Sequence, residues 1–308
     1  MRERSRWRRW VSSGVAVAAV LVLVGARAHR PHVAPIDWTR VGEALGKPGT
    51  VQPDGAYKAG LPRADLHVTV GAVAVKPALA LGSWVAFKQT GDSEAMLMGD
   101  LVLLEREVDP VLAKLQEGKI DETAIHNHLL HESPHVMYMH IVGRGGPERL
   151  AAAVHAALAG TGTPFGGSTP PAAPEGFGID TAQIAQIVGV RGKVNGGVYQ
   201  VGVPRAEQIT VDGIDVPPSM GLATALNFQP TGGGKAAITG DFVLIASEVN
   251  PVIRALRDDG VAVTALHSHM LADSPRLFFM HFWANDDALK LARGLRAALD
   301  QMNVKRAS

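Results

Sequence analysis

Cysteine is absent from the 308 residues of the sequence, which excludes disulfide bonds, thiolate metal sites, a cysteine nucleophile and a lipid-modified N-terminal cysteine. Aromatic residues make up only 5% of the chain, and the formal net charge is +1. Because basic residues are scattered beyond an N-terminal cluster, the electrostatic footprint of a nucleic-acid-binding protein is missing. Motifs for a P-loop, a dinucleotide-binding glycine fingerprint and a G-x-S-x-G nucleophile elbow are missing as well.

A long hydrophobic run is also missing, since the apolar stretch Val15–Val24 falls short of the about 20 residues that span a membrane. Arginines precede this stretch, and Ala26-Arg27-Ala28 follows it as an A-x-A cleavage site. These features predict a signal peptide over residues 1–28 and an exported protein of the periplasm, cell envelope or extracellular space. The alternative is an uncleaved anchor, which would be the one attachment to a membrane. Arg8-Arg9 loosely resembles a twin-arginine signal, so the export route stays open.

The rest of the chain repeats itself. The motif Tyr-x-x-Gly-x-Pro-Arg begins at Tyr57 and again at Tyr199, and the two copies align without a gap from Gly99 and Gly240 onward. Self-similarity over this length predicts a duplicated domain, with one repeat over residues 37–158 and the other over residues 178–302. The Gly- and Pro-rich residues 159–177 between them are interpreted as a linker, with a functional lid as the alternative.

Within each repeat, the second half predicts the order strand, helix, strand, strand, helix. In the first copy the strands are expected near residues 96–105, 122–130 and 135–142, and a helix capped by Asp109 is expected to begin at Pro110. The first half of each copy consists mostly of short β segments. The sequence therefore predicts an α+β fold in which each copy has a mainly antiparallel sheet with helices.

A histidine motif, H-x-H-x3-(E/D)-S-P-x5-H, occurs once in each repeat. The first copy supplies His126, His128, Glu132 and His140, and the second copy supplies His267, His269, Asp273 and His281. Because residues two apart on a strand face the same side, each H-x-H pair shares a face. Pairing the strands symmetrically about the Ser-Pro turn places His140 opposite His126 and His281 opposite His267, within reach of one another.

This arrangement predicts one divalent metal site in each repeat, built from three imidazoles and one carboxylate. Zinc is the first expectation, and iron or manganese would also suit these ligands. Glu132 and Asp273 are candidate ligands or catalytic general bases. The alternative is a set of structural histidines bonded to the backbone. The opposite face, which includes Ile125 and Met139, is expected to be core.

Other repeated polar residues have less specific roles. Asp100 and Asp241 are candidate ligand-binding residues, with a turn-forming role as the alternative. Arg63 and Arg205 are candidates for clamping an anionic group, or for pairing with those aspartates. Glu107 and Glu248 are expected to favour a helix N-terminus or to accept a hydrogen bond from a histidine.

Several of these motifs together resemble a known family. Gly99-Asp100-Leu101-Val102-Leu103, Thr123-Ala124-Ile125-His126-Asn127-His128 and Tyr138-Met139-His140, with their counterparts in the second repeat, are similar to the LppY/LpqO-type domain. The resemblance implies an exported bacterial protein of tandem-repeat build and of unknown function. The namesake lipoproteins carry a lipid-modified cysteine that this chain lacks. The H-x-H-x3-E core is also similar to the first metal motif of cupins, although the preceding helix fits a cupin barrel poorly.

The leading functional hypothesis is therefore an exported metal-binding protein, either a metal-dependent hydrolase or related enzyme, or a protein that only binds the metal. The alternative is a non-enzymatic cell-envelope module that holds a small-molecule ligand or partner between its two halves. The sequence indicates neither the substrate nor the oligomeric state.

Overall fold

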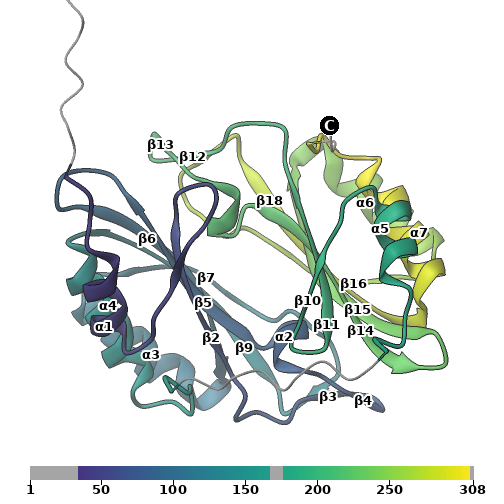
Figure 1. Cartoon of the computed structure of the whole chain (residues 1–308), viewed down its shortest axis with the longest axis horizontal. Coiled ribbons are helices and arrows are strands. Elements are labelled where there is room, and N and C mark those ends of the chain that lie inside the picture. The colour runs from purple at the N-terminus through teal and green to yellow at the C-terminus, as the bar shows by residue number, and fades with distance from the viewer. Residues whose placement is uncertain (1–33, 167–175, 306–308) are drawn as a thin grey trace, which may run out of the picture. The chain divides into compact units, whose positions relative to one another are not determined.

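The computed structural model describes residues 34–166 and 176–305 (Figure 1). The predicted signal peptide lies outside the described residues, as does the middle of the predicted linker. No helix in the described part of the chain is long and apolar enough to cross a membrane.

The first repeat contains short β segments followed by long paired strands and helices. Its elements are α1 (Trp38–Leu45), β1 (Thr50–Val51), β2 (Tyr57–Pro62), β3 (Thr69–Val70), β4 (Val73–Ala74), α2 (Pro77–Ala80), β5 (Gly82–Gln89), β6 (Ala95–Leu104), α3 (Glu105–Glu117), β7 (Asp121–His126), β8 (Glu132–Ser133), β9 (Val136–Gly145) and α4 (Pro147–Leu158).

The second repeat follows the same order, with a short 3-10 helix in place of α2. Its elements are α5 (Thr181–Val188), β10 (Lys193–Asn195), β11 (Val198–Pro204), β12 (Thr210–Val211), β13 (Ile214–Asp215), η1 (Pro218–Met220), β14 (Ala223–Gly232), β15 (Lys235–Ile245), α6 (Ala246–Asp258), β16 (Ala262–His267), β17 (Asp273–Ser274), β18 (Leu277–Asp287) and α7 (Ala288–Leu299).

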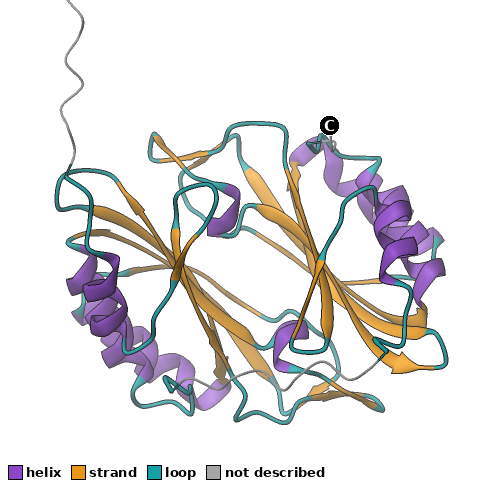
Figure 2. Cartoon of the chain, viewed as in Figure 1, coloured by secondary structure: helices purple, strands orange, loops and turns teal. Residues whose placement is uncertain are grey.

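Each repeat is built on a six-stranded antiparallel sheet of the same topology. The strand order is β1-β2-β5-β6-β9-β7 in the first repeat and β10-β11-β14-β15-β18-β16 in the second. A separate three-stranded sheet, β4-β3-β8 or β13-β12-β17, accompanies each of them. The predicted α+β fold with an internally duplicated domain is confirmed (Figure 2).

One face of each large sheet is covered by its own helices. In the first repeat the apolar side chains of β6 that point to this face, such as Leu97 and Leu101, pack with Val111 of α3 and Leu150 of α4. The second repeat builds the same layer with α5, α6 and α7. Burial of these aliphatic residues stabilises each repeat by roughly 1.5–3 kcal/mol per fully buried side chain.

The other face of each sheet is covered by the opposite repeat. One buried cluster joins Met96 and Met98 of β6 to Val243 and Phe279 of the second repeat. Two matched hydrogen bonds cross the same boundary: Thr123 Oγ1 donates to the His269 carbonyl oxygen, and Thr264 Oγ1 donates to the His128 carbonyl oxygen, each at 2.5 Å. The two histidine motifs are therefore held against each other.

Two local predictions are wrong. The helix expected to begin at Pro110 begins at Glu105, because Glu107 at the third helical position accepts a hydrogen bond from Leu104 N and so caps the helix earlier. Ile125 and its counterpart Leu266, expected in the core, are 41% and 46% exposed. They lie on β7 and β16, which are edge strands of the large sheets, and the helices do not cover them.

Candidate metal centre between the repeats

Rows of paired residues across each sheet position the acidic and histidine side chains. In the first repeat Gly60 of β2 is opposite Trp84, Trp84 is opposite Asp100, and Asp100 is opposite His140. The second repeat has the matching row Gly202, Ala225, Asp241 and His281. Neighbours in such a row point to the same face, here the face turned toward the other repeat.

The register of β7 differs from the prediction by two residues. His126 is opposite Tyr138, and His140 is opposite Ala124, where the sequence predicted that His126 and His140 would be opposite each other. The same shift occurs in the second repeat, where His267 is opposite Phe279. A two-residue shift keeps His126 and His140 on their predicted face, because the side-chain period of a strand is two.

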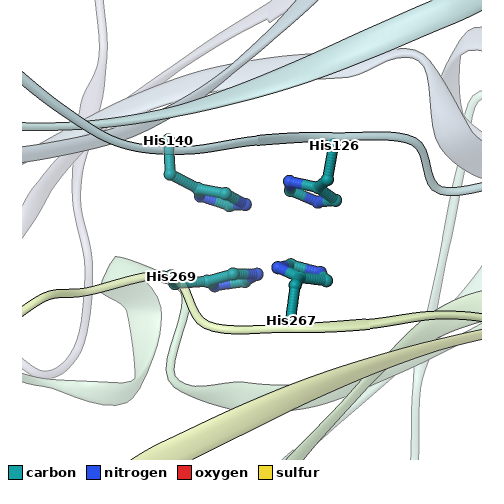
Figure 3. Close-up of side chains that lie close together, drawn as sticks. All are labelled: His126, His140, His267 and His269. Carbon is teal, nitrogen blue, oxygen red and sulfur yellow. The ribbon is translucent and has the colours of Figure 1, made fainter.

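The six histidines of the two motifs form one interleaved cluster. His126 and His267 stack with ring centroids 3.5 Å apart, His140 stacks on His269 at 3.6 Å, and His128 stacks on His281 at 3.7 Å. Each of these close pairs joins one repeat to the other. Figure 3 shows four of the rings, His126 and His140 above His267 and His269. The histidines of the two predicted sites therefore meet in one cluster, and the prediction of one site in each repeat stays a prediction.

Four groups of side chains within the described residues bring ligand atoms within 4.8 Å of one another. They are His126 with His140, His267 and His269; His126 with His128 and His281; Asp100 with His128 and His140; and Asp241 with His269 and His281. The first two groups each combine residues of both repeats. The last two correspond to each other under the exchange of the repeats.

The donor atoms of this cluster lack protein partners. The Nε2 atoms of all six histidines are buried without a hydrogen-bond partner, and so are Oδ1 of Asp100 and Oδ1 of Asp241. A buried polar atom without a partner costs about 1–3 kcal/mol. A divalent cation held by the three or four side chains of one candidate group would satisfy several of these eight atoms at once. The residues present thus fit a metal ion.

Backbone carbonyls orient two of the rings. Nδ1 of His281 lies 2.8 Å from the carbonyl oxygen of Gly240, and His140 makes the matching bond to the backbone of Gly99. When Nδ1–H donates to a carbonyl, the Nε2 lone pair is left to face the cluster. This is the usual support for a metal-bound imidazole.

Burial lowers the pKa values of the histidines and raises those of the two aspartates. Desolvation, followed by the nearby His267, lowers the pKa of His281 to about 3. The pKa values of His128, His140 and His269 are lowered for the same main reason. Burial raises the pKa of Asp100 to about 7 against the opposing charge of Lys58. Neutral imidazoles are the form that binds metal, and a cation would favour the ionised aspartates.

The predicted catalytic acids lie outside these groups. Glu132 Oε1 accepts a hydrogen bond from Val136 N, and burial raises the pKa of its carboxyl to about 7. Asp273 accepts hydrogen bonds from Leu277 N and from Arg276 Nη1. Neither acid takes part in any of the four candidate groups, whose carboxylates come from Asp100 and Asp241 instead. The repeated Gly-Asp pair predicted these two aspartates as ligand-binding or turn-forming residues, and both lie within long strands, β6 and β15.

Arg63 and Arg205, the candidates for binding an anionic group, make all their hydrogen bonds within the protein. Arg63 is completely buried and donates to Asp65, Glu107 and the carbonyl oxygen of Val102 through five hydrogen bonds. Arg205 makes the same five bonds to its counterparts. Because a guanidinium has five N–H donors, none is left for a ligand. Neither arginine pairs with Asp100 or Asp241, and Glu107 and Glu248 bind arginine, not histidine.

Three histidines that do not belong to the motif, His131, His135 and His155, lie outside the candidate groups. His131 and His135 are exposed, and His135 pairs with Glu105. His155 is partly buried and bonds to the carbonyl oxygen of Leu45.

A cavity of about 1110 Å³ opens beside the cluster. Both repeats line it, and the lining includes Asp100, His140, Asp241 and His281. A small molecule in this cavity would therefore reach the candidate metal ligands.

Comparison with known proteins gives a family but no activity. No curated protein matches the sequence. Two solved structures show a distant likeness: a trimeric bacterial microcompartment shell protein, PduB, at 11% identity over 84% of this chain and 95% of that chain, with a TM-score of 0.21, and EtuB from Clostridium kluyveri, at 9% identity over 82% and 88%, with a TM-score of 0.20. Likeness this low carries no conclusion about fold or function.

The family comparison is specific. The model of a domain of unknown function, DUF1259, matches residues 39–160 and again residues 182–301. Each match spans one large sheet with its helices and one copy of the histidine motif. The chain belongs to the DUF1259 family and carries two tandem copies of its domain.

Proposed function

We propose that the protein binds a divalent metal in a composite centre formed by both repeats. The observation that supports this most is the set of six buried Nε2 atoms without partners, drawn from both copies of the motif. Asp100 and Asp241 would complete the ligand set from either side. Zinc is the first choice for imidazole-rich ligands, with iron and manganese as alternatives.

The centre would suit an enzyme because an open cavity adjoins it. A bound divalent cation supplies Lewis acidity, which polarises a carbonyl or phosphoryl oxygen or activates water. The histidines would hold the ion, and whichever aspartate it leaves free would be placed to accept a proton. A metal-dependent hydrolase or a related enzyme fits this arrangement. The non-enzymatic alternative is a module that holds a small ligand in the same cavity.

We further infer that the protein is exported and is of the LppY/LpqO type. The basic cluster, the short apolar stretch and the Ala26-Arg27-Ala28 site support export, and the motifs described above support the type. Export predicts a mature chain that begins at His29 in the material secreted by cells that express the full sequence. Its N-terminal sequence, together with its recovery outside the cytoplasm, tests this. A chain that retains residues 1–28 in the cytoplasm would contradict export.

Metal analysis tests the centre directly. Purified protein would be incubated with zinc, iron or manganese, freed of excess ion, and its metal content measured. We expect bound metal in the wild type and a large loss in His126→Ala and His267→Ala, because His126 belongs to both histidine groups and His267 is its counterpart. His155→Ala, which changes a histidine outside the cluster, is the control. A wild type that takes up none of the three metals would rule out the centre.

A further inference from the structure

The cavity beside the histidine cluster has a floor kept open by glycine. Gly60 of β2 and Gly202 of β11 occupy equivalent positions and both line the cavity. An added Cβ at either position would meet nothing within 4 Å, and neither residue has a positive φ. Neither crowding nor backbone geometry therefore requires glycine there, although glycine inside a strand costs about 0.5–1 kcal/mol. Space for a ligand explains both positions.

One wall of the cavity carries a partly buried cation, Lys58. Lys58 lies two residues from Gly60 on β2, and its side chain faces the cavity. Its Nζ donates to the carbonyl oxygen of Ser219 at 2.8 Å and lies 4.0 Å from the ring centroid of Trp84. Within the described residues no carboxylate forms an ion pair with it. Burial lowers the pKa of Lys58 to about 8, although the nearby carboxylate of Asp100 opposes this shift.

The cavity carries lysines, but the two repeats do not contribute equivalent charges to it. Lys76 and Lys193 also line it, whereas the position equivalent to Lys58 in the second repeat is Gln200, whose amide donates to the carbonyl oxygen of Ala78. The aspartates that line the cavity are Asp100 and Asp241, and both belong to the candidate metal groups. A metal would neutralise them and leave the lysines as the free charges of the cavity.

We propose that this cavity binds a small organic anion, whose carboxylate or phosphate-type group contacts Lys58 while its body lies over Gly60 and Gly202. The row Gly60, Trp84, Asp100 and His140 crosses three strand intervals, so the histidine cluster lies roughly 14 Å from Gly60, at the far end of the row. The inference rests on the proposed metal centre for that far end only. A lysine ammonium suits either kind of anion as a point charge.

Calorimetric titration of the full, metal-loaded chain tests the proposal with simple probes. Benzoate and phenylphosphonate carry the expected anionic groups, and benzamide is the uncharged counterpart of benzoate. We expect at least one of the two anions to bind, and benzamide to bind about tenfold more weakly or worse, because hydrogen bonds to charged groups are worth about 1.5–3 kcal/mol. Binding should also change the fluorescence of Trp84, and this change should disappear in Trp84→Phe.

Two variants locate the anion. Lys58→Gln copies the residue of the second repeat and should weaken binding by about tenfold or more. Lys235→Gln removes an exposed lysine outside the cavity and should leave binding unchanged. The leucine side chain of Gly60→Leu should occupy the space of the cavity and abolish anion binding, while the metal content stays equal to that of the wild type. Circular dichroism of each variant verifies that it is folded.

The outcomes separate this inference from the metal centre. Metal-loaded wild type that binds neither anion at millimolar concentration, or Lys58→Gln that binds as well as wild type, would overturn the cavity proposal and leave the metal centre standing. A protein that takes up no metal, yet binds benzoate through Lys58, would overturn the metal centre and leave the cavity proposal standing.

Discussion

The two repeats have nearly the same framework but different cavity walls. Both place Gly, Asp and His in one row across the sheet, and both bury an arginine with the same five hydrogen bonds. The stacked pairs His128–His281 and His140–His269 differ by only 0.1 Å in centroid distance, 3.7 against 3.6 Å. Around the cavity, however, Lys58 and Trp84 of the first repeat correspond to Gln200 and Ala225 of the second. The shared centre is symmetric, whereas the surface beside it is not.

This difference indicates which parts of the molecule depend on both repeats. A centre made of interleaved side chains requires matching residues from each copy. The cavity wall does not, because a ligand lying on it is itself asymmetric. Substitutions at equivalent positions should therefore have equal effects in the framework and at the centre, and unequal effects at the wall.

The largest loss of stability is expected when either buried arginine is replaced. Arg63→Met would leave Glu107 buried without its cation, and loss of one member of a buried ion pair costs about 3–5 kcal/mol. Arg205→Met should cost about the same, because Glu248 would be left in the same state. Urea unfolding of metal-free protein measures both values.

The exposed pair Arg40–Asp37 supplies the control for this comparison. Arg40→Ala removes an arginine from a solvated ion pair and should change stability too little to measure. A small effect of Arg63→Met would show that water or another group replaces the guanidinium. A large effect in one repeat alone would show that the two frameworks are not equivalent.

The next effect concerns metal affinity. His128→Ala and His269→Ala remove equivalent ligands, so each should weaken metal binding by more than the 10–100-fold that loss of a supporting residue costs. The two losses should agree, because each removed ring stacks on a histidine of the other repeat. Competition with a metal chelator measures both affinities. If one variant kept wild-type affinity, the ligand set would be confined to one side of the cluster.

Much of the centre could be predicted from the sequence because strand periodicity is local. The H-x-H pairs and the third histidine share a face even though the register shifted by two residues, since an even shift preserves the face. The local pattern of His126 does not reveal that its closest ring is His267, more than a hundred residues away in the chain. That contact depends on the packing of one sheet against the other.

The acidic residues show the same limit. Glu132 is near the histidines in sequence and was the natural choice for a ligand, but its strand β8 pairs with β3 and leaves the large sheet. Asp100 is far from the motif in sequence, yet β6 pairs with β9 and brings it opposite His140. Proximity along the chain favoured Glu132, whereas the strand order places the carboxylate of Asp100 beside the histidines.

A smaller effect is expected at Tyr138, whose ring stacks on His128 at 3.3 Å and whose hydroxyl donates to the carbonyl oxygen of Ala80. The second repeat has Phe279 at this position, with its ring 3.4 Å from that of His269. Tyr138→Phe should therefore keep the stacking and lose one hydrogen bond, at a cost of about 0.5–1.5 kcal/mol. Urea unfolding measures the cost, and metal content should not change. A lower metal content in Tyr138→Phe would show that the Tyr138 hydroxyl supports metal binding, which Phe279 in the second repeat cannot do.

The smallest change in stability is expected when the glycines that line the cavity are replaced by alanine. The sign of this change is more informative than its size. Gly60→Ala and Gly202→Ala add a methyl group where nothing lies within 4 Å and φ is ordinary, so each should stabilise the protein by about 0.4–1 kcal/mol through the unfolded state. Thermal and urea unfolding of metal-free protein would detect this. Destabilisation at either position would mean that the strand needs glycine for its own packing. Stabilisation in both repeats would leave the open cavity as the reason why glycine is there.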